Sequence, residues 1–225
     1  MISFCVATNT GWCERQTYEL LDKLISSIER ECHEYEVLIC GNIKLERSCV
    51  RNLYVENMKL GAKNNYLFQE SKYPVICYIR DYMELVPGWK EGWDRFGYSH
   101  WDLGMNTVLN KDCSRFRDWC QWENEDNGPD WYQYEWGQQV YRKGSPYLAD
   151  YSDTRTNTMY ISGGYFLGQK DFLLQYPFDN NLDFAHAEDV KWYDSFRNKD
   201  FSYKMNTDST VRLNIQKDTI LKEKC

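Results

Sequence analysis

Short apolar runs alternate with a helical pattern through the first eighty residues, and this alternation limits the folds that the chain can adopt. Residues 2–7, 35–42 and 73–79 are runs of strand length, and each contains Val, Ile and Cys. Between the first two runs, residues 15–31 repeat Leu and Ile at helical spacing among charged side chains. A helix of this length between two strands is typical of a βαβ unit, which pairs its strands in parallel. The sequence therefore predicts an α/β fold with a mostly parallel central sheet flanked by helices.

The remaining predicted elements are shorter and less regular. Residues 61–72 form a second predicted helix that begins at a Gly, and residues 101–160 are rich in Trp, Tyr, Asp and Asn with little helical periodicity. We expect further strands at residues 53–57, 101–110, 159–168 (with a break at a Gly pair), 201–206 and 209–214, and further helices at 170–178 and 187–199. We find no internal repeat and no Pro- or Ser-rich linker, so we expect a single domain over residues 1–225.

Composition and charge argue against several classes of protein. The 225 residues carry a net charge of −7, which disfavours nucleic acid or anionic lipid as the main partner. No window approaches the ~18 apolar residues of a transmembrane segment, and the strand-like start predicts no secretory signal. The nine cysteines are odd in number and form no Cys-x-x-Cys pair, so we expect reduced thiols in a cytoplasmic protein. Aromatic residues make up 16% of the chain, which suits either a packed core or sugar-binding surfaces.

Polar residues end three of the predicted strands. Thr8 and Asn9 follow the first run, Gly41 and Asn42 end the second, and Arg80 and Asp81 end the third. In open parallel sheets, ligands bind beyond the carboxyl ends of the strands. We therefore expect these polar tips to form the ligand-binding edge.

Four stretches together carry a resemblance to a known family. They are "VATNTGW" after the first strand, "LGAKNNYLF" at the second helix, "YIRDYMELVPGW" at the tip of the third strand, and "SGGYFLGQKDF" with the later "FAHAEDVKWYDSFR". Their order resembles that of inverting, family 2-like glycosyltransferases with the GT-A fold, and is similar to small stand-alone transferases of viral and microbial genomes. The resemblance runs from about residue 2 to about residue 213. It implies a GT-A fold in which residues 1–100 bind the nucleotide sugar and residues 101–225 bind the acceptor.

The resemblance places the nucleotide-sugar donor on the first half of the chain. Thr8 and Asn9 correspond to the loop that holds the base and ribose, and Lys63 and Asn64 correspond to a helix start beside the diphosphate. The free N–H groups of a Gly-initiated helix and the compact charge of a Lys suit a diphosphate. By themselves, the same residues are also typical of a turn and of a surface lysine.

The tip of the third strand corresponds to the family's Asp-x-Asp motif, which holds a divalent cation that bridges the diphosphate. The sequence there is Arg80-Asp81-Tyr82, so Asp81 is the one carboxylate left to bind Mn²⁺ or Mg²⁺, and the diphosphate and water would supply the other ligands. Arg80 offers another route, because a guanidinium offsets phosphate charge directly. A structural ion pair between Arg80 and Asp81 also fits the residues.

The last stretch implies the acceptor site and the catalytic acids. Glu188 and Asp189 correspond to a helix start that supplies the base in inverting transferases. We expect Asp189 to deprotonate the acceptor hydroxyl while Glu188 binds acceptor hydroxyls, or the reverse. Gly163 and Gly164 correspond to the acceptor-side loop, and Tyr165 beside them is a candidate for stacking on a sugar. Acids in a first helical turn are also favoured by the helix dipole alone.

The predicted function is transfer of a sugar from a nucleotide-diphosphate sugar to a glycan or other hydroxyl-bearing acceptor, with inversion and with help from a divalent metal. Two alternatives remain open. A sugar nucleotidyltransferase would share the layout of the first half, but it needs a Gly-rich basic loop that "TNTGWCERQ" only weakly resembles. A catalytically silent carbohydrate-binding protein on the same fold agrees with the incomplete Asp-x-Asp motif.

Overall fold

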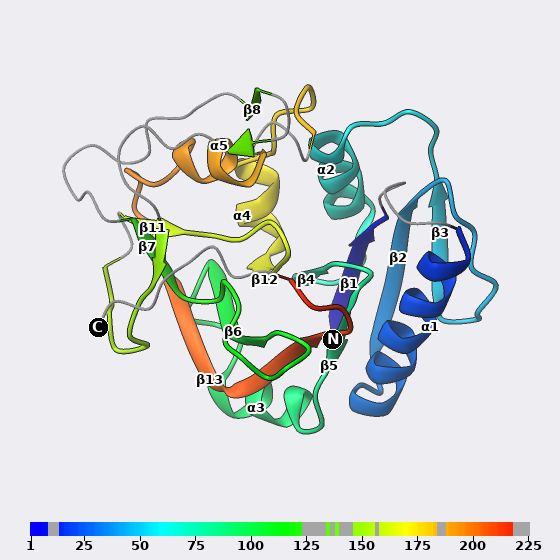
Figure 1. The fold of residues 1–225 in the computed structure, drawn as a ribbon, viewed down its shortest axis with the longest axis horizontal. Helices are drawn as coiled ribbons and strands as arrows, with labels where there is room; N and C mark the ends of the chain where they lie inside the picture. The colour runs from blue at the N-terminus through cyan, green and yellow to red at the C-terminus, as the bar shows by residue number, and fades with distance from the viewer. Residues whose placement is uncertain are drawn as a thin grey trace.

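A large sheet lies between two groups of helices and forms the centre of the molecule (Figure 1). The computed structural model describes residues 1–8, 14–122, 134–135, 138–139, 146–155, 158–183 and 188–217. The eight strands of the large sheet are, in spatial order, β3 (Val50–Tyr54), β2 (Tyr35–Gly41), β1 (Ile2–Ala7), β4 (Val75–Ile79), β12 (Tyr165–Gln169), β6 (Leu103–Leu109), β13 (Tyr203–Leu213) and β5 (Met83–Leu85).

The first four strands of this order are parallel. Strand β1 lies between β2 and β4, so that Ile2 is opposite Tyr35 on one side and Val75 on the other. Strand β3 continues the parallel order beside β2, and β13 is parallel to β6. The pairs β4–β12, β12–β6 and β13–β5 are antiparallel. The sheet is therefore mostly parallel, as predicted, and its parallel part brings the carboxyl ends of β1, β2 and β4 to one edge.

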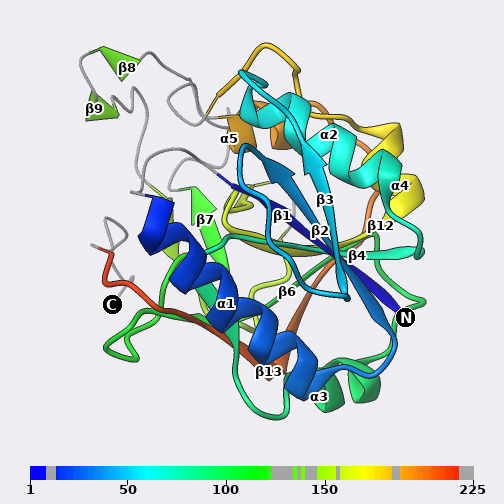
Figure 2. The same ribbon diagram turned by 90° about the vertical axis from the view of Figure 1, so that its right-hand side faces the viewer.

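Helices cover both faces of the sheet (Figure 2). Side chains alternate along a strand, so successive residues of β1 contact different layers on the two faces of the sheet. The Phe4 ring lies 5.7 Å from the Trp89 ring, whereas the Cys5 thiol contacts the backbone of Leu67. Helices α1 (Glu14–Glu31) and α3 (Trp89–Phe96) cover the first face, and α2 (Leu60–Glu70), α4 (Lys170–Gln175) and α5 (Glu188–Asp194) lie over the second.

Many of the aromatic residues pack in the core. Phe166 of β12 stacks on Trp192 of α5 with ring centroids 5.1 Å apart, and Trp192 stacks in turn on Phe178 at 4.5 Å. Trp89, Trp93 and Trp192 are among the largest fully buried side chains. Rings of this size remove a large apolar area from water, so they stabilise the contact between helices and sheet. For these residues, the core interpretation of the aromatic composition is confirmed.

Two small sheets accompany the large one. The first has three antiparallel strands in the order β10 (Pro146–Leu148), β7 (Cys120–Trp122) and β11 (Met159–Tyr160). The second pairs β8 (Tyr134–Glu135) with β9 (Gln138–Gln139). The three-stranded sheet lies next to α5 in the fold, which matters for the site described below (Figure 1).

Three of the predicted strands are wrong in a way that has a physical reason. Residues 159–168 do not form one strand: β11 and β12 belong to different sheets, and a turn at Gly163 and Gly164 separates them. Residues 201–206 and 209–214 do not form two strands but the single strand β13, whose register shifts between Asn206 and Thr210. A bulge absorbs the extra residues there, so the strand continues where the sequence pattern breaks.

The predictions of no membrane-spanning segment and of reduced cysteines can be compared with the described residues. None of the described helices has both the length and the apolar character needed to cross a bilayer. The seven cysteines that the structure describes are all free: Cys5, Cys32, Cys40, Cys49, Cys77, Cys113 and Cys120. Burial raises the pKa of Cys5 and of Cys32 to about 12, so these thiols behave as small apolar core residues.

Candidate functional site

The tips of β1 and β2 touch at the carboxyl edge of the sheet. The backbone N–H of Thr8 donates to the carbonyl oxygen of Cys40 at 3.0 Å, and the Thr8 hydroxyl reaches the same oxygen at 3.3 Å. A Cβ atom on Gly41 would lie 1.9 Å from Thr8 Oγ1, so only glycine allows this approach. Thr8 is therefore held at the predicted ligand edge, while Asn9 lies outside the described residues.

Helix α2 brings Lys63 to the tip of β1. Its ammonium donates to the carbonyl oxygen of Thr8 at 3.1 Å, and the side chain is largely buried. Burial lowers the pKa of Lys63, and the charge of Arg80 lowers it further. Asn64 is buried beside it, and its Oδ1 atom has no hydrogen-bond partner among the described residues. Lys63 and Arg80 thus place two positive charges at the strand tips, near enough for one to act on the other.

A cavity of about 540 Å³ opens next to Lys63, beyond the ends of β2 and β3. This volume falls within the usual range for small-molecule sites, about 300–1,000 Å³. Asp183 lies in its wall and acts on Lys63 as a negative charge. The lining residues are Asn42, Tyr54, Val55, Glu56, Asn57, Met58, Lys59, Lys63 and Asp183.

The tip of β4 presents Arg80 and Asp81 beside a glycine turn. The backbone N–H of Arg80 donates to the carbonyl oxygen of Gly164 at 3.1 Å, and its guanidinium donates to the Tyr78 hydroxyl at 3.3 Å. Asp81 is buried, and its Oδ2 atom has no hydrogen-bond partner among the described residues. Burial raises the pKa of Asp81, while the charges of Arg80 and Lys217 oppose that rise.

The same glycine turn holds Asp189, the second residue of α5. Asp189 Oδ2 accepts hydrogen bonds from the Gly163 N–H at 2.9 Å and from the Tyr160 hydroxyl at 3.1 Å, and Oδ1 accepts one from Val190 N–H at 2.9 Å. A Cβ atom on Gly163 would lie 2.9 Å from the Cβ atom of Asp189, so a side chain there would push the acid away. The turn therefore joins the acid at Asp189 to the strand tip at Arg80.

Glu188 precedes Asp189 and is buried. Burial raises the pKa of Glu188 to about 8, the neighbouring charge of Asp189 adds to the rise, and Arg80 opposes it. Burial also raises the pKa of Asp189, against the three hydrogen bonds that it accepts. At neutral pH the pair therefore holds a proton on Glu188. Arg80 is the positive charge that acts both on Lys63 at the strand tips and on Glu188 at the start of α5.

We expect the Glu188→Gln variant to flatten the pH dependence of stability. Because the pKa of Glu188 rises from 4.5 to about 8 on folding, the folded state binds the proton more tightly, and stability falls as pH rises from about 4.5 to about 8. Urea unfolding at pH 5, 6.5 and 8 measures the slope. The exposed Glu91→Gln serves as the matched control. An equal slope in Glu188→Gln and the unchanged protein would contradict the burial argument.

The prediction for Tyr165 is wrong. Its ring is almost completely buried, with 1% of the residue exposed, so it offers no face to a sugar. Its hydroxyl instead binds Asn106 Oδ1 and accepts from Trp89 Nε1 at 3.1 Å. Side chains alternate along β12, so the residue directly after the glycine turn points into the core and not toward the site.

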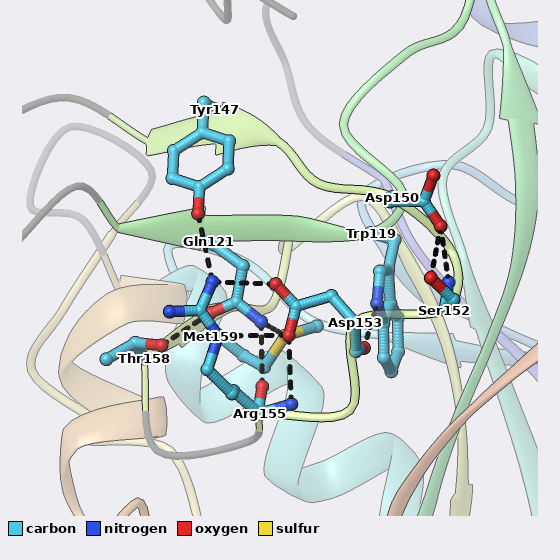
Figure 3. Close-up of polar contacts among 9 residues, drawn as sticks. All are labelled: Trp119, Gln121, Tyr147, Asp150, Ser152, Asp153, Arg155, Thr158 and Met159. Carbon is cyan, nitrogen blue, oxygen red and sulfur yellow. Dashed lines mark hydrogen bonds and ion pairs between the residues drawn. The ribbon is translucent and has the colours of Figure 1, made fainter. Parts of the chain in front are cut away.

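A polar network fixes the small sheet that carries Tyr160 (Figure 3). The Gln121 amide of β7 donates to the carbonyl oxygen of Arg155 at 2.7 Å and accepts from the Thr158 hydroxyl. The Arg155 guanidinium is held in turn by Asp153, with atoms 2.7 Å apart. Buried amides that find all their partners rigidify the strands around them. The network thereby stabilises the position from which Tyr160 reaches the acid.

Comparisons with known proteins bear on this arrangement. No model of a known protein family and no curated protein matches the sequence. Solved structures do match. Over 97% of its length the chain is similar to 44% of GalNAc-T7, in a crystal structure with UDP, GalNAc and Mn²⁺, with a TM-score of 0.63 and 12% identity. Over 91% of its length it is similar to 60% of S. aureus TarS 1–349, with a TM-score of 0.54 and 12% identity. Both are GT-A glycosyltransferases.

The chain has the GT-A fold. It spans less than two thirds of the length of either of these GT-A structures. In the GT-A fold of this chain, the cationic strand tips and the two acids lie on either side of one glycine turn. The predicted residues Thr8, Lys63, Arg80, Asp81, Gly163, Gly164, Glu188 and Asp189 are thus brought to one region.

The residues around Asp81 do not fit the divalent cation that the GT-A resemblance predicted. Hard divalent cations need several oxygen ligands: Mg²⁺ takes about six, and Ca²⁺ takes about six to eight. Within the described ranges, no group of three His, Cys, Asp or Glu side chains could hold a metal ion. Asp81 supplies one carboxylate, and Arg80 and Lys217 act on it as positive charges. Among the described residues, one carboxylate beside two cations is a poor donor set for Mn²⁺ or Mg²⁺, because those cations would repel a third.

The sequence did not reveal three residues of this candidate site. Asp183 lines the cavity, Tyr160 donates to Asp189, and Lys217 lies beside Asp81. Tyr160 belongs to the aromatic-rich region, in which composition does not separate core from site. Asp183 and Lys217 lie in segments without helical or strand periodicity, so no sequence pattern marks them.

Proposed function

We propose that the protein transfers a sugar from a nucleoside-diphosphate sugar to an acceptor hydroxyl, with inversion. One observation carries the proposal: the turn accepts a hydrogen bond from the backbone N–H of Arg80 at the Gly164 carbonyl oxygen and donates one to Asp189 from the Gly163 N–H. A residue whose guanidinium can offset diphosphate charge and a residue that can accept a proton are therefore tied to the same short turn.

The donor is proposed to bind at the first half of the chain, about residues 1–100. The cavity beside Lys63 takes the nucleoside, and the edge that includes Thr8 and Asn64 supports it. Lys63 and Arg80 face the diphosphate, because ammonium and guanidinium groups make strong hydrogen bonds to phosphate oxygens. These cations offset the negative charge that develops on the leaving diphosphate as the bond to the sugar breaks.

The acceptor is proposed to bind at the second half, about residues 101–225, against Gly163 and Gly164. Asp189 takes the proton of the acceptor hydroxyl while the oxygen attacks the anomeric carbon from the face opposite the diphosphate. The hydrogen bonds from Gly163 and Tyr160 aim its carboxylate. Glu188 carries a proton at neutral pH and can donate it in a hydrogen bond to an acceptor oxygen. The free cysteines support a reducing, cytoplasmic setting.

A panel of UDP-, GDP-, CDP- and dTDP-sugars tests the function. At a hundredfold excess over its Kd, a bound donor should raise the melting temperature by about 5–10 °C. The same donor should release its nucleoside diphosphate when an acceptor glycan is added. The matching nucleoside monophosphate is the control and should shift the melting temperature less. Binding of free glycans without any response to nucleotide sugars would contradict the proposal and favour a silent carbohydrate-binding protein.

A further inference from the structure

Lys217 lies over the ring of Tyr82 at the tip of β4. Its ammonium nitrogen is 3.7 Å from the ring centroid, which is well within the range of a cation–π contact. Tyr82 directly follows Asp81, the residue at which the resemblance predicted a metal. The side chain of Lys217 is partly exposed, whereas Asp81 and Tyr82 are buried. The lysine therefore lies over the Tyr82 ring and near enough to Asp81 to act on its charge.

The segment after β13 is tied down so that Lys217 stays at this place. The backbone N–H of Asn214 donates to the Tyr82 carbonyl oxygen at 2.7 Å. Asn110 then binds both backbone groups of Lys217: its Oδ1 accepts from the N–H at 2.9 Å, and its Nδ2 donates to the carbonyl oxygen. Next to it, Gln216 Nε2 donates to Asp112 at 3.0 Å. Two hydrogen bonds hold the backbone of Lys217, so its place in the structure is fixed more firmly than that of an ordinary surface lysine.

The charges around this lysine suit an anion. Arg80 and Lys217 both act on Asp81, so two cations face one carboxylate, and the described residues complete no metal site there. Lys63 lies within electrostatic reach of Arg80 and also of the negative charge of Asp183. A diphosphate carries two or more negative charges, so it would complement Arg80 and Lys217, whose two positive charges exceed the single negative charge of Asp81.

We propose that Lys217 is a donor-binding residue that contacts the diphosphate of the nucleotide sugar and, with Arg80, takes the place of a divalent metal. This inference rests on the proposed function and names a further residue of the same site. The ring of Tyr82 holds the ammonium without neutralising it, and the ammonium is a compact charge with three donors for phosphate oxygens. The bond between sugar and diphosphate would then break without a metal, because fixed cations offset the charge of the leaving group.

Calorimetric titration with inorganic pyrophosphate and with UDP, in the presence of EDTA, tests the proposal. We expect the unchanged protein to bind both without metal. Lys217→Met and Lys217→Gln should weaken binding by about 10- to 100-fold, as expected for a lost hydrogen bond to a charged group. Lys217→Arg should keep most of the affinity. Lys204→Met, at an exposed lysine of β13, is the matched control and should bind like the unchanged protein.

Two results would overturn the proposal: pyrophosphate binding that disappears in EDTA, or affinity in EDTA that is the same in Lys217→Gln as in the unchanged protein. Melting curves of each variant show whether it remains folded, and the glutamine variant keeps a polar tip for that purpose. Binding of pyrophosphate that depends on Lys217, without turnover of any nucleotide sugar, would support the anion site while removing the proposed transferase activity. The two proposals can therefore fail separately.

Discussion

Replacing Asp189 with Asn should lower the rate of sugar transfer by about 10²- to 10⁴-fold, which is the usual contribution of a positioned general base. The amide has the shape of the carboxylate, but it cannot take the proton of the acceptor hydroxyl. Donor binding should change little, because the cationic strand tips lie on the other side of the glycine turn. Initial rates at saturating substrates and calorimetric donor affinity, measured on the same preparation, separate the two effects.

The control for this experiment is Asp200→Asn, a change at an exposed carboxylate, and it should leave the rate unchanged. Tyr160→Phe removes one of the hydrogen bonds to Asp189 and should cost less than the loss of the acid. Full activity in Asp189→Asn together with a large loss in Glu188→Gln would show that Glu188 is the base and that Asp189 is not. Full activity in both variants would remove the proposed mechanism.

Replacing Asn106 with Leu should lower the free energy of unfolding by about 3 kcal/mol or more. Asn106 Oδ1 accepts from Trp89 Nε1 at 3.2 Å, from Trp93 Nε1 at 3.1 Å, and from the Tyr165 hydroxyl. All of these groups are buried, and leucine accepts no hydrogen bond. Trp89 Nε1 keeps the Tyr165 hydroxyl as a partner, but the Trp93 indole and the Tyr165 hydroxyl lose this acceptor, and each buried donor left without a partner costs about 1–3 kcal/mol. Urea unfolding followed by tryptophan fluorescence measures the change.

Met105→Leu is the matched control for Asn106→Leu. Met105 is the preceding residue of β6 and is also buried, and exchanging one apolar side chain for another of similar volume usually costs under about 1.5 kcal/mol. If the free energy of unfolding of Asn106→Leu lies within about 1 kcal/mol of that of the unchanged protein, the indole and phenol groups have found other partners. The argument from unsatisfied donors is then wrong.

The sequence predicts the parallel part of the sheet well because its strands are buried on both faces. Residues 75–79 are apolar throughout, residues 2–7 are apolar except for Ser3, and the long helix 14–31 has a clear periodicity, so both kinds of element are visible without contacts. The grouping of Arg80 with Glu188 and Asp189 follows from the resemblance and is consistent with their electrostatic interaction in the structure.

Features that depend on contacts between distant segments could not be predicted. Tyr165 follows two glycines in a polar context, yet the register of β12 turns its ring toward Asn106 in the core. Lys217 has no periodic neighbours, and hydrogen bonds from distant residues, those of Asn110 among them, place it beside Tyr82. In both cases the position of the side chain is decided by a partner about fifty or more residues away in the sequence.

The glycine turn would give the proposed reacting centre a fixed width. The Gly163 N–H bonds to the carboxylate of Asp189 and the Gly164 carbonyl oxygen bonds to the backbone N–H of Arg80, so main-chain atoms of one turn hold the two proposed halves of the centre together. Exchanging a side chain on either side would then alter reactivity while the spacing stays the same. Such a centre could accept a new donor or a new acceptor through substitutions in the surrounding binding pockets, while the arrangement of the reacting groups stays the same.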